Sequence, residues 1–373
     1  MKDILICTVG TSLLNNIKSW EAPDTVEKYF TAGNLAGLSH ELSHLTISDR
    51  RLGAEINSIY RIIHGGLLEK RGELVFFVSD TDEGRMTGRL LVDYFSNRKN
   101  PCFFEEIWFD VIEGLTDRDV VRFEKEGLKN LVKMLADLAW NRGAERILIN
   151  ATGGYKAQIS FAGMIGQALD MPVCYLFEGF PRVIQLPPQP ISLDLSFWLE
   201  NAEWFFALDD LEAEEDIPLN DRRFEVLTDR LECDGKVYFG FSPAGQLYHE
   251  TFCRRFYQSR DRLLPPVVDI PHDKKKIRME DNNRGKHPGL GNHLKKVCRL
   301  PYVKEIFTHY YNPDLVKANC FRKSSRGNMS HVEGWFSKGG ALTKFDVMTT
   351  ASTREEQQAC IADLNSFLRS GSL

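Results

Sequence analysis

A polar turn near the middle of the chain combines flexible backbone with hydrogen-bond donors and a cation. Residues 146–160, RILINATGGYKAQIS, pass from an apolar run through this turn into a segment whose apolar residues have helical spacing. The turn offers six candidate ligand-binding residues: Asn150, Thr152, Gly153, Gly154, Tyr155 and Lys156. Glycines let backbone approach a ligand, and the first amides of a helix lack intrahelical partners and lie at the positive end of its dipole. The pattern predicts a phosphate-binding turn, although an ordinary strand-to-helix turn of an α/β sheet would fit it equally well.

Two further apolar runs, early in the chain, also end in small polar turns. The candidate ligand-binding residues of these turns are Gly10, Thr11 and Ser12 after the first run, and Asp80 and Thr81 after the second. In an open parallel sheet the ligand crevice lies at the carboxyl ends of the strands, so we expect the three turns to meet there. The second turn is equally compatible with a solvated start of the helix that follows it.

A parallel sheet is the element that could bring these turns together. Apolar runs at 107–112, 173–177 and 183–186 read as further strands, and a long amphipathic helix is expected over 117–140. Alternating strands and helices are typical of an α/β doubly wound sheet. With 373 residues the chain is too long for one ordinary domain, so two or three are expected.

The composition is that of a soluble globular protein. Hydrophobic residues make up 43% and charged residues 27% of the chain, which is enough apolar material to bury real cores. No apolar run is long enough to span a bilayer, and Lys2 and Asp3 interrupt any signal-peptide pattern. The eight cysteines form no CxxC pair, so we expect reduced thiols in a cytoplasmic protein and no structural metal.

Basic residues gather in the last third of the chain, although the whole chain has a net charge of -5. Between positions 271 and 326 lysine and arginine outnumber aspartate and glutamate, which is typical of a nucleic-acid backbone site. A solvated basic face would have the same composition. RNA cleavage through the 2'-hydroxyl needs groups that move protons and stabilise phosphate charge. We expect that role for nine residues: Arg284, Lys286, His287, His293, Lys296, Arg322, Lys323, Arg326 and His331. No cluster with metal-ligand spacing is visible, which predicts a metal-independent site without cofactors.

The secondary structure of this last third is expected to be a small helix-plus-antiparallel-sheet unit. The pattern predicts a helix over 302–311, strands at 315–322, 331–336 and 341–349, and a capped helix from 352. The preceding segment 221–256 predicts a hairpin with helices, which fits a winged-helix-like connector or a plain spacer.

The segments TVGTSL, from Thr8, and NATGGYK, from Asn150, together resemble the CRISPR-associated Rossmann-fold (CARF) family of sensor domains. The resemblance covers roughly the first half of the chain. It implies a cyclic oligoadenylate as allosteric activator, with cyclic tetra-adenylate as the first ring size to test. It also implies a homodimer that binds the activator across its two-fold axis, and it leaves open whether the sensor degrades its ligand.

The basic carboxyl-terminal unit resembles the RelE family of messenger RNA interferases in shape and charge, without a fixed motif. Together the two resemblances indicate an effector of type III CRISPR antiviral defence that cleaves messenger RNA on the ribosome and inhibits translation, with no membrane or DNA partner. The expected organisation is a Rossmann-like CARF sensor at 1–195, a winged-helix-like connector at 196–265 and an α+β RelE-like ribonuclease at 266–373.

Three alternatives to this interpretation remain open. Arg326 and His331 have the Arg-x4-His spacing of HEPN ribonucleases, although Gly327 argues against the helix on which that motif works. A metal-dependent PD-(D/E)xK nuclease would need a carboxylate and a Glu-x-Lys on adjacent strands, and the sheet region offers Glu333 without that triplet. A CARF domain with a winged helix could also be a ligand-sensing transcription regulator.

Overall fold

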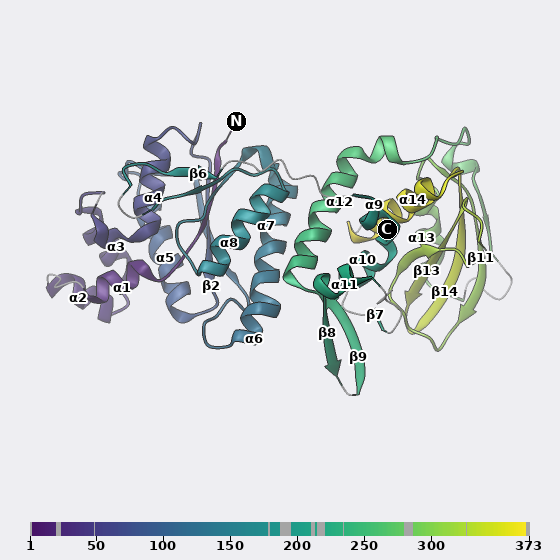
Figure 1. Cartoon of the computed structure of the whole chain (residues 1–373), viewed down its shortest axis with the longest axis horizontal. Coiled ribbons are helices and arrows are strands. Elements are labelled where there is room, and N and C mark those ends of the chain that lie inside the picture. Colours follow the sequence, from purple (N-terminus) through teal and green to yellow (C-terminus); the bar gives the residue numbers. More distant parts are fainter. Residues whose placement is uncertain are drawn as a thin grey trace. The chain divides into compact units, whose positions relative to one another are not determined.

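The computed structural model describes residues 2–19, 24–47, 49–177, 180–186, 195–209, 213–214, 221–233, 235–279, 286–325 and 327–370 (Figure 1). The chain forms two compact units, Met1–Ile191 and Ser192–Leu373, here called unit 1 and unit 2. The expected sensor boundary at 195 lies close to this division. The expected boundary between connector and ribonuclease, at 265, falls inside unit 2.

Unit 1 is built on a six-stranded sheet in the order β3-β2-β1-β4-β5-β6. Its strands are β1 Ile4–Thr8, β2 Glu73–Ser79, β3 Glu106–Ile112, β4 Ile147–Asn150, β5 Val173–Tyr175 and β6 Ile184–Leu186. All neighbouring strands are parallel except β5 and β6. This is the strand order of a doubly wound dinucleotide-binding sheet, and it confirms the expected Rossmann-like α/β architecture.

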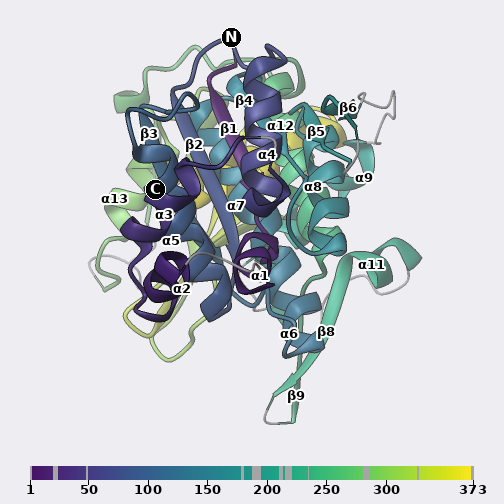
Figure 2. The ribbon, with the colours of Figure 1, turned by 90° about the vertical axis from the view of Figure 1, so that its left-hand side faces the viewer.

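Helices cover both faces of this sheet, with α4 and α5 on one side and α7 and α8 on the other (Figures 1 and 2). The helices of unit 1 are α1 Ser12–Ser19, α2 Asp24–Thr31, α3 Leu35–Ser43, α4 Gly53–His64, α5 Asp82–Ser96, α6 Val120–Arg122, α7 Leu128–Arg142 and α8 Lys156–Ala168. Short helices η1, η2 and η3 span Arg50–Leu52, Phe123–Gly127 and Ala144–Arg146. Because both faces are covered, β1 and β2 are buried along their whole length, which explains their continuous apolar sequences.

Unit 2 begins with helices and a small antiparallel sheet of order β7-β9-β8. These elements are α9 Leu195–Glu200, α10 Ala202–Asp209, β7 Ala213–Glu214, α11 Arg222–Leu227, β8 Thr228–Cys233, β9 Lys236–Phe241 and α12 Pro243–Leu263. A hairpin flanked by helices agrees with the expected outline of the connector. Its large buried aromatic residues, such as Trp198 and Phe252, belong to one hydrophobic core that also includes Phe345 and Cys360 of the following segment.

A second sheet in unit 2 has five strands in the order β10-β11-β14-β13-β12. Its elements are η4 His272–Lys274, β10 Lys276–Arg278, α13 Leu290–Val297, β11 Val303–Asn312, β12 Cys320–Lys323, β13 His331–Lys338, β14 Ala341–Thr349 and α14 Arg354–Arg369. Phe345 and Val347 of β14 pack in the core with α13 and α14, so these helices cover one face of the sheet. Lys344 and Asp346 alternate with them and therefore lie on the opposite face.

The expected helix over 302–311 is wrong, because this segment is the strand β11. Its sequence VKEIFTHYYN is rich in β-branched and aromatic residues, which favour strands, and it pairs antiparallel with β14 over its whole length. The change matters for the RelE resemblance, which rested partly on a helix at this place. The expected final helix is confirmed: Thr353 caps α14, and Glu356 Oε2 accepts a hydrogen bond from the Thr353 amide at 3.3 Å.

Candidate functional site

The first candidate site is the crevice at the carboxyl ends of β1 and β4 in unit 1. These neighbouring strands lie at the switch point of the sheet, because the chain continues from β1 toward β2 and from β4 toward β5. The turn after β1 carries Gly10, and the turn after β4 carries Gly153 and Gly154. A Cβ atom on Gly10 would lie 2.9 Å from the Gly154 nitrogen, so the two turns touch through bare backbone.

Beneath these turns lies a buried carboxylate, Glu55 of α4, which is 1% exposed. One of its oxygens accepts a hydrogen bond from the Gly10 amide at 2.9 Å, and the other accepts one from Ser12 Oγ at 3.3 Å. Burial raises the pKa of Glu55, and the Gly10 hydrogen bond opposes that shift. A Cβ on Gly153 would lie 2.1 Å from Glu55 Oε1, so Glu55 fixes both turns at once. Sequence analysis missed Glu55, because nothing around it distinguishes it from a solvated helix residue.

The predicted ligand-binding residues of the β4 turn divide into structural and accessible ones. Asn150 is 1% exposed, and its amide donates to Ser58 Oγ at 2.8 Å. Thr152 donates to Asn150 Oδ1 at 2.6 Å and accepts from the Leu176 amide at 3.0 Å. These side chains hold the turn in shape. Lys156, the first residue of α8, is exposed, so its ammonium is available to a ligand.

Tyr155 precedes α8, and its amide donates to Gln158 Oε1 at 3.2 Å. Its half-buried ring packs edge-on against Phe123 at 5.3 Å. In the β1 turn, Thr11 is half-buried, and its hydroxyl accepts a hydrogen bond from the side-chain amide of Asn15, with Nδ2 at 3.4 Å. A partly accessible hydroxyl beside bare backbone fits a polar ligand.

The third turn, after β2, is organised by Asp80. Its carboxylate accepts hydrogen bonds from Arg85 at 2.5 Å and from the Gly114 amide at 3.1 Å, and it lies 3.4 Å from an Arg122 nitrogen. Thr81 caps α5 by accepting a hydrogen bond from the Gly84 amide at 2.9 Å. Asp80 therefore holds two arginines that the sequence analysis did not single out. The three turns together offer Lys156, two arginines and exposed backbone, which suits a phosphate-bearing ligand.

We predict that Glu55→Ala destabilises unit 1 by about 1–3 kcal/mol, because the Gly10 amide loses its buried acceptor. Glu55→Gln keeps a carbonyl oxygen of the same size and should retain most of the stability. Thermal and urea unfolding of the full chain would measure the difference, with exposed Glu27→Ala as the control. Equal losses in Glu55→Ala and Glu55→Gln would contradict the hydrogen-bond role.

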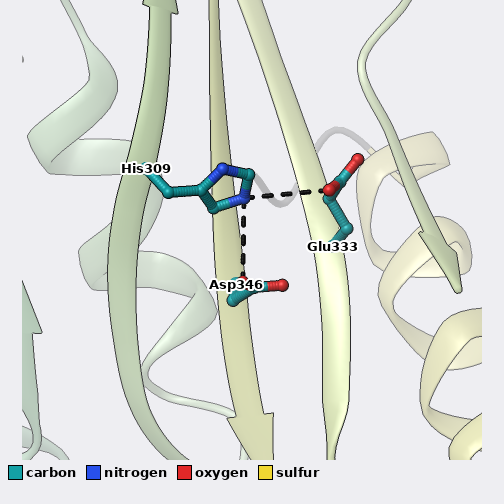
Figure 3. A group of neighbouring side chains, drawn as sticks. All are labelled: His309, Glu333 and Asp346. Atoms are coloured by element: carbon teal, nitrogen blue, oxygen red, sulfur yellow. Dashed lines mark ion pairs between the residues drawn. The ribbon is translucent and has the colours of Figure 1, made fainter. Parts of the chain in front are cut away.

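The second candidate site lies in unit 2, on the face of the large sheet opposite α13 and α14. His309 of β11, Glu333 of β13 and Asp346 of β14 converge there (Figure 3). His309 Nε2 lies 3.7 Å from Glu333 Oε2 and 3.7 Å from Asp346 Oδ2. The three side chains are 17%, 12% and 1% exposed, so this is a largely buried charge cluster. It is here called the carboxylate–histidine cluster.

Cations and an aromatic ring lie next to this cluster, on the same strands and on the neighbouring strand β12. Arg322 of β12 pairs directly with Glu333, which in turn pairs with Asp346, so the three lie in one row across the sheet. The next row pairs Trp335 with Lys344. The Trp335 ring lies 4.6 Å from the Arg322 guanidinium and 4.3 Å from Lys344 Nζ, and both are cation–π contacts. Two cations are therefore held beside two carboxylates, an arrangement that could both accept a proton and stabilise phosphate charge.

A hollow of about 390 Å³ opens at the edge of the same sheet. It is lined by residues of β10 and β11 and by Met279: Arg278, Met279, Glu305, Phe307 and Thr308. Phe307 pairs with Asp346 across β11 and β14, so the hollow borders the row that contains the cluster. The arrangement offers space for part of a substrate next to the charged groups.

Of the nine predicted catalytic residues, the described part of the structure places Arg322 in this row. His331 is the half-buried first residue of β13, with its ring 5.9 Å from that of Phe307. Lys323 is tied to α9 and α10: its amide donates to Glu203 at 2.8 Å and its ammonium to the Glu200 carbonyl at 3.0 Å. Lys286 is exposed and Lys296 is half-buried on α13. Arg284 and Arg326 lie outside the described residues.

Two predicted catalytic histidines belong to the core instead, which corrects the sequence analysis. His287 is 4% exposed, with Nδ1 2.8 Å from Thr343 Oγ1 and Nε2 3.1 Å from the Lys338 carbonyl oxygen. His293 is 6% exposed and packs against the ring of Phe336 at 4.8 Å. Burial lowers the pKa of both histidines, that of His293 to about 4. His287 is held by hydrogen-bond partners, and His293, on α13, packs among aromatic rings in the core between the helices and the sheet.

A metal-independent site was expected because no group of metal ligands was visible in the sequence. That reason is wrong, because His309, Glu333 and Asp346 form such a group. The carboxylate–histidine cluster was missed because His309 was assigned to a helix and because strand register is not visible in the sequence. The HEPN alternative is also corrected: Gly327 has a φ of +69°, and His331 begins β13, so the segment after Arg326 is a turn and a strand.

The burial of His293 leads to a prediction about pH. The unfolded chain takes up a proton near the ordinary pKa of 6.5, whereas the folded chain resists protonation down to about 4. The unfolded state therefore binds more protons in this window, and stability falls as the pH falls from 6.5 to 4 by up to roughly 3 kcal/mol. His293→Leu should remove that part of the pH dependence. Chemical unfolding at pH 7 and pH 4.5 would measure the change in unfolding free energy with pH. The same change in the wild type and in His293→Leu would contradict this account.

The fold and the two candidate sites together define a two-unit protein: a Rossmann-like unit with a crevice at its switch point, and a second unit with a charged centre on a sheet. The family model described as CRISPR-associated protein (Cas_APE2256) matches residues 50–189, which lie in unit 1 and include the β4 turn. This segment, which is less than half of the chain, is similar to that family.

Among solved structures, the chain is similar to Can2 from Sulfobacillus thermosulfidooxidans in complex with cyclic tetra-adenylate. The two are 10% identical, the match covers 72% of this chain and 70% of that chain, and the TM-score is 0.27. Such a TM-score is too low to assign a shared fold. No curated protein shows significant similarity to the chain. Within the described residues, none of the helices has both the length and the apolar character needed to cross a membrane.

Proposed function

We propose that this protein is a signal-activated endoribonuclease of type III CRISPR antiviral defence, working in the cytoplasm. Unit 1 binds a cyclic oligoadenylate, and unit 2 cleaves RNA when the activator is bound. The similarity of residues 50–189 to a CRISPR-associated family supports the defence role. The observation that carries the nuclease assignment is the row of Arg322, Glu333 and Asp346 beside His309, because it joins proton-accepting groups to a phosphate-binding cation.

The chemistry of unit 1 favours a ligand with several phosphates. Lys156 is exposed at the start of α8, where the positive end of the helix dipole attracts an anion. Arg85 and Arg122, which Asp80 holds at the neighbouring β2 turn, add guanidinium donors, although Arg122 also pairs with Glu126 at 3.0 Å. A ring of repeated adenylates has internal symmetry, which matches a homodimer with identical crevices on each side of a two-fold axis. We therefore propose a homodimer with cyclic tetra-adenylate as the activator.

The chemistry of unit 2 is cleavage through the 2'-hydroxyl of RNA. The carboxylate–histidine cluster supplies the group that removes the proton from the attacking hydroxyl. Arg322 and Lys344 stabilise the additional charge on the phosphate, because both side chains are cations beside the cluster. The exposed ring of Tyr310, which lies 5.6 Å from Lys344 Nζ, provides a flat surface for a base.

We propose messenger RNA on the ribosome as the substrate, as the RelE resemblance implies. The excess of lysine and arginine between positions 271 and 326 supports binding to RNA. The positioning that a ribosomal decoding site offers can lower a barrier by about 7–11 kcal/mol. Because Glu333 and Asp346 beside His309 can accept a proton, the ribosome serves to position the RNA and does not replace a missing base.

Lys156→Ala should weaken cyclic tetra-adenylate binding by about ten- to hundredfold, since a charge-assisted contact to phosphate contributes roughly 1.5–3 kcal/mol. Calorimetry with the full chain would measure the affinity, and exposed Lys99→Ala serves as the control. Unchanged affinity in Lys156→Ala would remove this residue from the site. Tighter binding of cyclic tri- or hexa-adenylate than of cyclic tetra-adenylate would change the proposed ring size but not the proposed site.

Glu333→Gln and Asp346→Asn should each reduce RNA cleavage at saturating activator by about 100-fold or more, because they remove proton-accepting charge from the centre. The assay compares one messenger with and without ribosomes, and exposed Glu355→Gln in α14 is the control. Cleavage of the messenger only when ribosomes are present is the expected result for the wild type. Equal rates with and without ribosomes would reject the RelE-like substrate, and full activity in both variants would reject the centre.

A further inference from the structure

The carboxylate–histidine cluster has the ligand arrangement of a metal centre. One nitrogen of His309 and one oxygen each of Glu333 and Asp346 lie within 4.8 Å of one another, on three adjacent strands (Figure 3). The two distances from His309 Nε2 are 3.7 Å. Ligands about 2.0–2.2 Å from one ion lie roughly 3–3.5 Å apart, so small side-chain movements would close the site around a cation.

Each carboxylate of the cluster is oriented by a second group. Glu333 Oε1 accepts a hydrogen bond from the Trp335 indole nitrogen at 2.7 Å and lies 3.9 Å from Lys344 Nζ. Asp346 Oδ1 accepts one from Ser324 Oγ at 3.1 Å. In both residues the other oxygen faces His309 Nε2. Metal ligands are commonly held in this way, with outer hydrogen bonds that fix the free oxygen toward the ion.

His309 is aimed into the cluster by a β-bulge. The register of β11 against β14 shifts between Thr308 and Tyr310, so His309 is the extra residue of the bulge. A bulge turns a side chain away from the regular alternation of a strand, and bulges occur often at functional sites. Within the part of the chain that the structure describes, His309 Nε2 is buried without a hydrogen-bond partner. A buried imidazole nitrogen that faces two carboxylates is placed as a metal ligand is placed.

The charge of the cluster also favours a cation. Glu333 and Asp346 are directly paired across β13 and β14, and like charges at such positions repel. Their side chains are only 12% and 1% exposed, so water screens this repulsion poorly. Lys344, whose Nζ lies 3.9 Å from Glu333 Oε1, offsets part of this repulsion, and a divalent cation between the two carboxylates would offset more of it.

We infer that His309, Glu333 and Asp346 bind one divalent cation. The donor set of two carboxylates and one imidazole suits Mn²⁺ and chemically similar ions, because carboxylate oxygens favour Mg²⁺ and Mn²⁺ and imidazole binds transition metals. Three protein ligands leave coordination positions for water or a phosphate oxygen. A bound cation would occupy all three side chains and would itself make the attacking hydroxyl easier to deprotonate, in place of a free carboxylate. That part in cleavage rests on the proposed function, but binding of the cation does not.

The test measures Mn²⁺ binding to the full chain, freed of metal on a chelating resin, without RNA or activator. Electron paramagnetic resonance detects free Mn²⁺, so binding appears as a loss of that signal during a titration. We expect one tight site per chain. Pulsed electron paramagnetic resonance of the bound Mn²⁺ should show coupling to a coordinated imidazole nitrogen. This coupling should be absent in His309→Ala.

Four variants locate the site. His309→Ala and Glu333→Gln should lower the Mn²⁺ affinity at least tenfold. Trp335→Phe keeps an aromatic ring but removes the hydrogen bond to Glu333, and it should weaken binding by about tenfold. Glu305→Gln, which changes another carboxylate on β11, should bind as the wild type does. Circular dichroism would show that each variant is folded, and Glu333→Gln and Trp335→Phe decide the matter if His309→Ala does not fold.

The outcomes for the cation and for the proposed function are separable. No loss of free Mn²⁺ with the wild type, or the same affinity in the wild type, Glu333→Gln and Trp335→Phe, would overturn the cation site. A cation site in a protein that cleaves no RNA would leave this inference intact and reject the nuclease. RNA cleavage by a chain that binds no Mn²⁺ would do the reverse.

Discussion

The antiparallel register of β13 against β14 is the constraint on which the second unit depends. It places Glu333 opposite Asp346 and Trp335 opposite Lys344 on one face, and Val332 opposite Val347 on the other. Because successive side chains alternate between faces, a shift of one residue would move the charged row into the helix-covered core and the apolar row out of it. The hydrophobic effect that fixes the core therefore also fixes the geometry of the charged centre.

Unit 1 uses a buried polar group for a similar purpose. Glu55 costs free energy to bury, yet its hydrogen bonds to the Gly10 amide and Ser12 define the shape of the β1 turn. The close approach of that turn to Gly154 then depends on the absence of side chains at Gly10 and Gly153. In both candidate sites, polar side chains are held in place by neighbouring groups: Glu55 holds the β1 turn, and Trp335 and Ser324 hold Glu333 and Asp346.

Sequence patterns predicted the elements that follow a simple period and failed where tertiary pairing decides. The buried runs of β1, β2 and β4, the strand at Ala341–Thr349 and the cap at Thr353 follow from composition and spacing alone. The segment Val303–Asn312 was predicted as a helix although its β-branched and aromatic residues favour a strand, and its pairing with β14 is a long-range effect that the sequence does not show. With His309 misplaced, the cluster could not be found. His287 and His293 were predicted to be catalytic because residue type reveals chemistry but not burial.

The common core of unit 2 bears on how such proteins evolve. Aromatic residues of α9, α10 and α12 pack in one cluster with β13, β14 and α14, so the helical segment and the large sheet stabilise each other. Recombination that joined a new first unit at residue 265 would separate α9, α10 and α12 from the rest of that core. A join between Ile191 and Ser192 would cut through neither unit. Exchange of the first unit among related proteins is therefore expected to carry the helical segment and the large sheet together as one inherited block.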